Sequence, residues 1–216
     1  LSPNEFWYFW RRFMPGNEFR PREELERTVD SKTLQAEIAG ITDLFRKPFA
    51  TKGMIFNENI PYMADIFPNA MFVWIRRQPE YNIQSLLLAR QRHNGDMSQW
   101  YSFKIQKYPQ LKNLNPLDSV AGQVAAINYS VEQGIGNLPD DNKLTVEYED
   151  FCKNPESYYW RIAERLRTLS DATSIEIPQY TGEKVLSSTN HWRLREYSLN
   201  NAQQTYIKHM SKLERY

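Results

Sequence analysis

Cysteine and long hydrophobic runs are scarce in this sequence, and each scarcity excludes a class of protein. The 216 residues include one cysteine, Cys152, which can form neither an intrachain disulfide nor a cysteine-built zinc site. Such cysteine usage fits a reducing compartment, so we expect a cytoplasmic location, although the sequence is compatible with a targeting segment ahead of Leu1. No run approaches the roughly 18 apolar residues of a membrane-spanning helix, and nothing resembles a signal peptide.

An excess of charge of one sign is also missing. Lys and Arg number 27 against 26 Asp and Glu, which leaves a formal net charge of +1. This balance excludes a general attraction to nucleic acid or to an anionic membrane, so we expect neither as a partner, and any anion site must be local. The length suits one domain over residues 1–216 with a substantial core, and it gives no indication of the oligomeric state.

What the sequence does contain is a strand that runs into paired arginines and then into a helix. Residues 71–75 form a short apolar, β-prone run between a Pro-Asn turn signal and a Gln-Pro break, which predicts a strand covered on both faces. Pro79 suits the first position of a helix, and apolar residues recur at roughly helical spacing up to Arg92. The free N–H groups at that helix start favour an anion, and Arg77 at the strand end can bind two phosphate oxygens at once. The local sequence also fits a surface arginine paired with a carboxylate.

Apolar periodicity and turn signals predict the remaining elements. The predicted helices cover residues 6–13, 23–45 with a break near Asp30-Ser31 or Gly40, 59–66, 118–133 with Gly134 as the stop, and a segment that begins at Asn154-Pro155. The further predicted strands cover residues 49–56 and 144–148, and the longest irregular segments are 93–117 and 174–198. The first helix is apolar most of the way round, so it either lies in the core or lines a pocket.

Strands that alternate with helices of this length predict an α/β fold of three layers, a mainly parallel sheet flanked by helices. Ligands of such sheets bind beyond the carboxyl ends of the strands. Arg77 and Tyr148 both sit at a predicted strand end, and Lys52 lies within another predicted strand, so we expect the three side chains to converge on one crevice. Arg76 should point away from Arg77, because successive strand residues alternate faces.

A series of motifs follows one order and spacing along the chain. It consists of Lys52, the Phe-Pro-Asn-Ala turn at 67–70, the run Phe-Val-Trp-Ile-Arg-Arg-Gln-Pro at 72–79, and Ser85 eight residues after Arg77. Together these resemble the central region of sulfotransferases that use 3′-phosphoadenosine 5′-phosphosulfate (PAPS). Farther on, residues 146–151 and 154–156 resemble the family's Tyr-Glu-Asp-Leu segment and its Asp-Pro helix start. The run from Trp192 through a helix that ends at residues 213–216 is similar to the tail of the bacterial and tyrosylprotein-type branch.

The resemblance implies a P-loop-NTPase-like sulfotransferase fold, PAPS as the cofactor and no metal. It implies that Arg77 and Ser85 bind the 3′-phosphate of PAPS, that Tyr148 contacts the adenine, and that Lys52 lies near the transferring sulfuryl group. Taken from the residues alone, Tyr148 equally suits the end of a core strand, and Lys52 equally suits a solvated lysine.

Two features depart from the family pattern. Gln78 stands where the family has an aspartate after the arginine, and a neutral amide caps a helix less well and orients an arginine less firmly. None of the eight glycines is followed by Lys, Ser or Thr, so none opens the P-loop-like turn whose N–H groups cradle the 5′-phosphosulfate in the family. Because residues 1–13 resemble the region shortly after the helix that follows that turn, we expect the turn to precede Leu1 and the domain at 1–216 to be incomplete at its N-terminus.

The implied reaction is in-line transfer of a sulfuryl group from PAPS to an acceptor hydroxyl or amine, with Lys52 stabilising the leaving phosphate. The base that takes the acceptor proton is not identifiable, since the visible candidates are ordinary surface or loop residues by pattern: Glu5, Glu58, His93 and His191. The alternative is a non-catalytic nucleotide-binding or scaffold relative that lost the phosphate loop. A kinase of related fold fits less well, because Glu149-Asp150 is the only acidic pair at a predicted strand end and the resemblance assigns it to structure.

The acceptor is indicated only in outline. The segment 93–117 carries aromatic residues that form either a wall for the acceptor or a packed lid, namely Trp100, Tyr101, Phe103 and Tyr108. An aromatic wall suits a sugar, a phenol or an apolar chain, so we expect a small-molecule or carbohydrate acceptor. The near-neutral charge argues against a highly sulfated polyanion.

Overall fold

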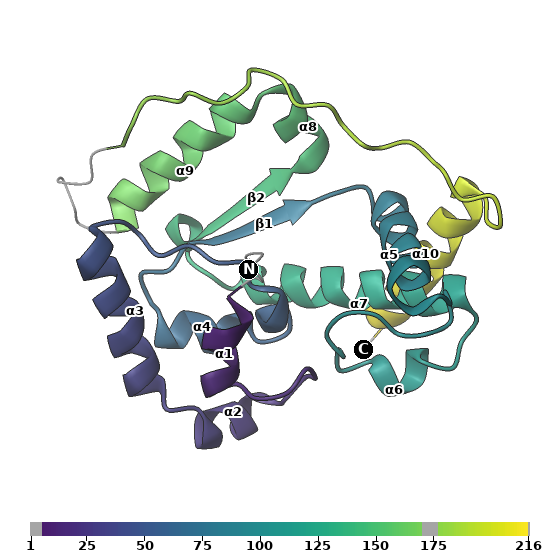
Figure 1. Ribbon diagram of the computed structural model, residues 1–216, viewed down its shortest axis with the longest axis horizontal. Helices are drawn as coiled ribbons and strands as arrows, with labels where there is room; N and C mark the ends of the chain where they lie inside the picture. The colour runs from purple at the N-terminus through teal and green to yellow at the C-terminus, as the bar shows by residue number, and fades with distance from the viewer. Residues whose placement is uncertain (1–5, 170–176, 216) are drawn as a thin grey trace.

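The computed structural model describes residues 6–169 and 177–215, and its helices surround a small sheet (Figure 1). In chain order the elements are α1 Trp7–Phe13, α2 Arg22–Thr28, α3 Ser31–Phe45, the 3-10 turn η1 Met54–Phe56, α4 Ile60–Ile66, β1 Phe72–Arg76, α5 Pro79–Asn94, α6 Tyr108–Leu111, α7 Pro116–Gly136, the 3-10 turn η2 Asp140–Asn142, β2 Lys143–Glu147, α8 Tyr148–Lys153, α9 Pro155–Leu169 and α10 Leu199–Leu213. Glu5 and the first residues of the predicted irregular segment 174–198 lie outside the described residues.

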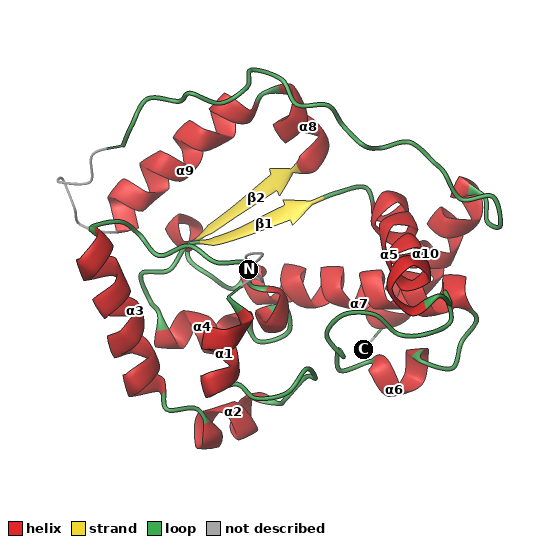
Figure 2. Cartoon of the chain, in the orientation of Figure 1, coloured by secondary structure: helices red, strands yellow, loops and turns green. Residues whose placement is uncertain are grey.

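Two parallel strands form the sheet in the described part of the chain, as Figure 2 shows. β1 and β2 pair from Phe72 opposite Lys143 to Arg76 opposite Glu147. The connection between them contains α5 and α7, which is the helical crossover that parallel strands require. The predicted α/β class is therefore confirmed.

Helices cover the two faces of this sheet unequally. On one face Trp74 packs against a cluster that includes residues of α7, and on the other Leu144 of β2 packs against Tyr158 of α9. Val73 and Ile75 of β1 share the second face, because paired residues of parallel strands project the same way, and they are 39% and 62% exposed. The prediction that this strand is covered on both faces is wrong, since α9 packs on β2 and leaves the outer side chains of β1 in solvent.

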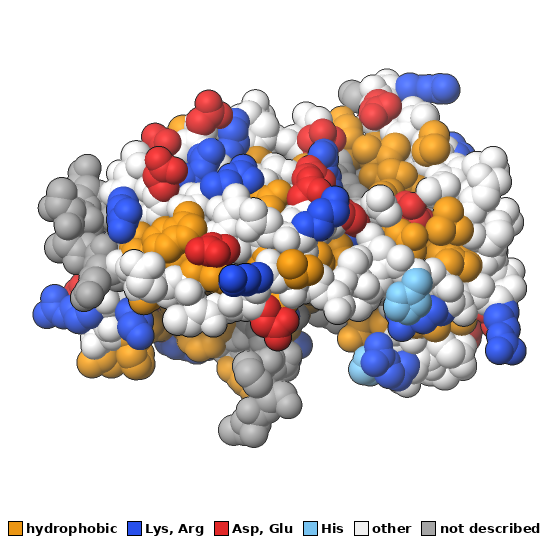
Figure 3. Space-filling model, turned by 90° about the horizontal axis from the view of Figure 1, so that it is seen from above, with side chains coloured by type: hydrophobic (Ala, Val, Ile, Leu, Met, Phe, Trp, Pro, Cys, Tyr) orange, Lys and Arg blue, Asp and Glu red, His pale blue; other side chains and the backbone are white. Residues whose placement is uncertain are grey.

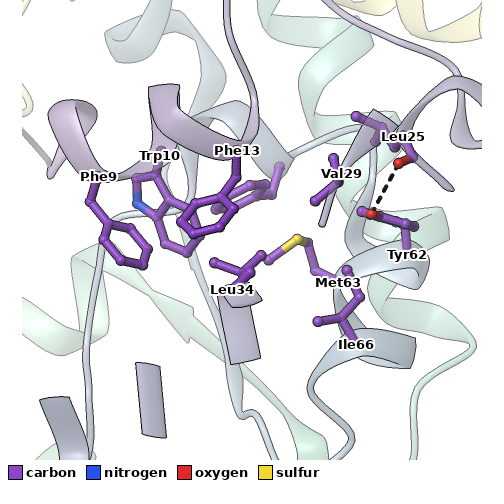
Figure 4. Close-up of a cluster of buried hydrophobic side chains, with 10 residues drawn as sticks. Phe9, Trp10, Phe13, Leu25, Val29, Leu34, Tyr62, Met63 and Ile66 are labelled. Carbon is purple, nitrogen blue, oxygen red and sulfur yellow. Dashed lines mark hydrogen bonds between the residues drawn. The ribbon is translucent and has the colours of Figure 1, made fainter. Parts of the chain in front are cut away.

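The aromatic N-terminal helix belongs to the core. Phe9, Trp10 and Phe13 of α1 pack with apolar residues from α2, α3 and α4, among them Leu34 and Met63 (Figure 4). The rings of Phe9 and Trp10 meet edge to face with centroids 5.0 Å apart. Of the two expectations for this segment, core packing is confirmed.

Helix boundaries follow local capping chemistry. The predicted break at Asp30-Ser31 separates α2 from α3, and the Asp30 carboxylate accepts a hydrogen bond from the Thr33 N–H at 3.0 Å, which caps α3. Pro79 opens α5 as predicted. Gly95, with φ of 73°, ends that helix in the left-handed conformation that glycine favours.

Three predictions about individual elements are wrong. Residues 49–56 form no strand but an irregular segment that ends in η1, because β-prone side chains do not make a strand without a neighbour to pair with. Gly134 does not stop its helix, since α7 continues to Gly136. A Cβ on Gly134 would lie 2.9 Å from the Cβ of Ile60, so this glycine allows α4 and α7 to approach closely. Tyr148 does not end β2 but begins α8.

The C-terminal helix lies beside α5 and α7 (Figure 1). Ala202 of α10 is fully buried in a cluster that also contains Ile83 of α5 and Val120 of α7. The amphipathic tail helix expected from the resemblance is therefore present. Among the described residues, every helix is too short or too polar to cross a membrane.

Candidate functional site

Arg77 and Tyr148 meet at the carboxyl ends of the two strands. Arg77 directly follows β1, and Tyr148 is the first residue of α8 directly after β2. The Arg77 Cζ atom lies 4.9 Å from the centroid of the Tyr148 ring, and both side chains are half-buried. The predicted convergence of these two residues is observed, because parallel strands bring their ends to one edge of the sheet.

The segment between α9 and α10 crosses this edge, and we call its residues 186–193 the strap (Figure 1). Arg77 Nε donates to Asn190 Oδ1 at 2.7 Å, and Arg77 Nη2 donates to Thr189 Oγ1 at 3.2 Å. The hydroxyl groups of Tyr148 and Thr189 lie 3.3 Å apart. The Arg77 guanidinium also lies 5.7 Å from the centroid of Tyr81 on α5, so two tyrosine rings and the strap surround it.

Backbone contacts attach the strap at two points. The Leu186 N–H donates to the carbonyl of Cys152 at 2.7 Å, which joins the strap to α8. Gln84 of α5 donates through Nε2 to the His191 carbonyl at 2.9 Å and accepts from the Arg193 N–H through Oε1. Because the Gln84 side chain is fully buried, these bonds fix the strap against the beginning of α5.

A carboxylate stands near Gln78, although Gln78 itself lacks one. The Gln78 side chain does not cap α5, whereas its N–H donates to Glu149 Oε1 at 3.1 Å. The same Glu149 oxygen accepts from Asn190 Nδ2 at 2.6 Å. Glu149, Thr189 and Asn190 were not among the predicted site residues. Glu149 was visible as a residue after a strand, whereas nothing in the spacing indicates that Asn190 would meet Arg77.

Ser85 lies on the same side of α5 as Tyr81, one helical turn farther along. It is half-buried, and the Tyr81 ring between it and the helix start contacts Arg77. A role for Ser85 in binding a phosphate stays a prediction.

Lys52 does not lie in a strand, although its predicted placement depended on one. It is exposed in the irregular segment between α3 and η1, next to Thr51, whose hydroxyl accepts a hydrogen bond from Trp10 Nε1 at 3.3 Å. No strand register aligns Lys52 with Arg77, so its role near the sulfuryl group stays a prediction.

Arg76 points away from Arg77, as strand alternation predicts. Its Nη2 lies 2.5 Å from Glu147 Oε1, and its Nε donates to Glu147 Oε2 at 3.1 Å. This bidentate hydrogen bond to Glu147 raises the pKa of Arg76. Adjacent arginines thus have separate roles, because one is paired with a carboxylate and the other with neutral oxygens.

Glu58, one of the predicted candidate bases, lies beside a small cavity. Burial raises its pKa to about 7, while the Gln106 N–H, which donates to both carboxylate oxygens at 3.0 and 3.1 Å, acts in the opposite direction. The carboxyl group borders a cavity of about 50 Å³ that is otherwise mainly apolar and is lined in part by Phe103 and Ile127. His93 stacks on Tyr101 with ring centroids 4.8 Å apart, and His191 belongs to the strap.

The aromatic residues of segment 93–117 pack mostly on one another. Trp100 Nε1 donates to the Phe103 carbonyl at 3.3 Å, and its ring meets Tyr108 edge-on at 4.9 Å. Arg90, which is fully buried on α5, lies 5.0 Å from the Trp100 ring centroid. These contacts favour the packed lid over the open aromatic wall, with Phe103 as the member that reaches a cavity.

The acidic pair after β2 does not form a joint site. Glu149 accepts the two N–H donors described above, whereas Asp150 Oδ1 lies 3.0 Å from Lys153 Nζ. The two carboxylates therefore have different structural partners, which argues against a shared magnesium ligand. Charged side chains of both signs are interspersed on the face shown in Figure 3, so a cationic site such as Arg77 acts locally.

An arginine and a tyrosine lie beyond the carboxyl edge of this parallel sheet, the edge at which α/β sheets bind their ligands. A model described as the sulfotransferase family matches residues 19–170, more than half of the chain, and the chain therefore belongs to this family. The match includes Lys52, Arg77, Ser85 and Tyr148 but ends before the strap. Comparisons with curated proteins and with solved structures found no match.

Proposed function

We propose that this sulfotransferase takes the sulfuryl group from PAPS, with Arg77 and Ser85 binding the 3′-phosphate and Tyr148 contacting the adenine. One observation carries the proposal: a half-buried arginine is held at the carboxyl end of β1 between the Tyr148 and Tyr81 rings. In the described part of the chain its oxygen partners are the neutral groups of Thr189 and Asn190, so its positive charge is available to a phosphate.

The chemistry requires little covalent work from the protein. An acceptor oxygen or nitrogen attacks the sulfur, the bond from sulfur to the 5′-phosphate oxygen breaks, and adenosine 3′,5′-bisphosphate leaves. The acceptor proton passes to a base, and a cation stabilises the leaving phosphate, for which Lys52 is our candidate. The proposal assigns to Arg77, Ser85 and Tyr148 the 3′-phosphate and adenine half of the donor.

The acceptor in this proposal is a small molecule or a carbohydrate with a hydroxyl or amine group. The mixed surface charge and the net charge of +1 favour an uncharged or weakly charged acceptor over a sulfated polyanion. Assignment to the bacterial and tyrosylprotein-type branch rests on the tail from Trp192 onward and belongs to the same proposal.

Calorimetric titration with adenosine 3′,5′-bisphosphate tests the donor site. Arg77→Ala should weaken binding by about 2 to 4 kcal/mol, because a partly buried charge-assisted contact is lost. Arg76→Ala is the matched control: it removes the same charge one residue away, at a side chain that faces Glu147, and should bind nearly as the wild type does. Equal affinities of wild type and Arg77→Ala would remove Arg77 from the site.

A second candidate is a relative that binds the nucleotide without transferring the sulfuryl group. One observation within these 216 residues favours it: none of the eight glycines is followed by Lys, Ser or Thr, as the last glycine of a P-loop is. Labelled PAPS with a panel of phenolic, sugar and lipid alcohols separates the two candidates. Labelled product supports the transferase, and bisphosphate binding without product supports the second candidate.

A further inference from the structure

A chain of hydrogen bonds holds the Arg77 side chain in place, and this chain ends at a carboxylate. Arg77 Nε donates to Asn190 Oδ1 at 2.7 Å, and Asn190 Nδ2 donates to Glu149 Oε1 at 2.6 Å. Glu149 Oε1 also accepts the Gln78 N–H at 3.1 Å, on the residue that follows Arg77. This chain of hydrogen bonds therefore runs from Arg77 through the strap and α8 to the backbone of Gln78, the next residue in the sequence.

We propose that Glu149 and Asn190 are positioning residues that fix the Arg77 guanidinium for the 3′-phosphate of the donor. This inference rests on the proposed function. An arginine side chain loses rotamer freedom when it is ordered, so a site that orders it before the ligand arrives binds more tightly. The two tyrosine faces restrict the plane of the guanidinium, and Asn190 fixes its rotation within that plane.

An amide is the side chain that this position requires. It must accept from a guanidinium on one side and donate to a carboxylate on the other, and asparagine carries both groups. The opposite orientation of the amide would set two donors against each other at Arg77 and two acceptors against each other at Glu149, so the network fixes the amide orientation. The carboxylate of Glu149 bonds to the Asn190 amide, and the amide bonds to Arg77. The negative charge therefore stabilises this arrangement without neutralising the guanidinium.

The arrangement also decides which edge of the guanidinium meets the ligand. Of its five N–H groups, Nε–H and one on Nη2 donate to the strap in the described part of the chain. The Nη1 end of the fork points away from these partners, and that end can bind phosphate oxygens. Asn190 and Thr189 thus hold one edge so that the opposite end is presented.

Affinities for adenosine 3′,5′-bisphosphate and adenosine 5′-phosphate, measured by calorimetry, test this role. Asn190→Ala and Glu149→Gln should each weaken the bisphosphate about tenfold, the size of one lost charge-assisted hydrogen bond, and change the monophosphate less than about twofold. Asp150→Asn is the control, because it removes the same charge from the next residue, whose carboxylate lies on Lys153. In an Arg77→Ala background, Asn190→Ala should have no further effect. Equal losses of affinity for both nucleotides would overturn the role. A tenfold loss caused by Asn190→Ala in the Arg77→Ala background would overturn it as well.

A readout without ligand separates this inference from the proposed function. The Arg77 Nε–H signal in a nitrogen-proton NMR spectrum is identified by its absence in Arg77→Lys. Asn190→Ala should move this signal and speed its exchange with water, whereas Asp150→Asn should leave it in place. An unmoved signal in Asn190→Ala refutes the positioning role. A wild type that does not distinguish bisphosphate from monophosphate refutes the donor site instead.

Discussion

The role of a side chain in this protein depends more on the groups that it contacts than on its residue type. Arg76 and Arg77 are adjacent and chemically identical, yet one forms a bidentate pair with Glu147 and the other lies between tyrosine rings with neutral oxygen partners. The sequence predicted this division through strand alternation alone. It did not predict Asn190, which is 113 residues from Arg77 and lies in a segment without periodicity.

Ser85 provides a test at the residue scale. Ser85→Ala should weaken adenosine 3′,5′-bisphosphate by about 1 kcal/mol, because a neutral hydroxyl contributes less than a guanidinium. The affinity for adenosine 5′-phosphate should stay the same, so discrimination between the two nucleotides falls. Competition binding with both nucleotides measures this. Unchanged discrimination would make Ser85 a packing residue of α5.

Glu58 predicts a pH dependence of stability. Burial raises its pKa from the ordinary value of 4.5 to about 7 in the folded protein, so between these values the folded state binds more protons than the unfolded state. Its contribution to the free energy of unfolding is therefore full below about pH 4.5 and is lost as the pH rises through about 7. Glu58→Gln mimics the neutral form and should be more stable than wild type at pH 8 by about 1 to 3 kcal/mol, with little difference at pH 5.

Urea unfolding at the two pH values measures this difference. Glu164→Gln, at an exposed position on α9, is the control and should follow the wild type at both. A Glu58→Gln variant that shows the wild-type loss of stability between pH 5 and pH 8 would contradict the assignment.

Elements were predictable where the sequence carries its own boundary signals. Pro79 marked the start of α5, and one of the two predicted breaks, near Asp30-Ser31, marked the start of α3, because these signals depend on a few neighbouring residues. The strand predicted at 49–56 failed because strand formation depends on a partner elsewhere in the chain. Gly134 was misinterpreted because a glycine that ends a helix and a glycine that admits another helix look alike in sequence.

Gly134 and Gly40, both inside helices, give a matched pair of substitutions at the element scale. Gly134→Ala should destabilise the protein, because a Cβ there lies 2.9 Å from Ile60 Cβ and overpacking costs about 1 to 3 kcal/mol. Gly40→Ala, inside α3 with open space around the new Cβ, should stabilise it by about 0.5 to 1 kcal/mol. Thermal unfolding of both variants decides the sign. Equal shifts would contradict the close approach of α4 and α7.

At the scale of the whole molecule, the strap joins the sheet edge to the C-terminal helix. The strap is hydrogen-bonded to α8 at Leu186, contacts Arg77 and Tyr148, and is hydrogen-bonded to Gln84 before α10 begins. The family match ends before the strap, so Thr189 and Asn190, which accept hydrogen bonds from Arg77, lie outside the matched region. The candidate site thus combines a predictable strand end with a tertiary contact that no local pattern encodes.

The outer edge of β1 has a consequence for the behaviour of this 216-residue chain at high concentration. Within residues 6–169 and 177–215 β1 pairs with a strand on one side only, and Val73 and Ile75 beside that edge are exposed. A row of open backbone groups next to branched apolar side chains is a template for strands of other molecules. Light scattering should show self-association that grows with protein concentration, and Val73→Lys should suppress it without lowering the melting temperature. Scattering that does not grow with concentration, or that Val73→Lys does not reduce, would show that this edge does not mediate self-association.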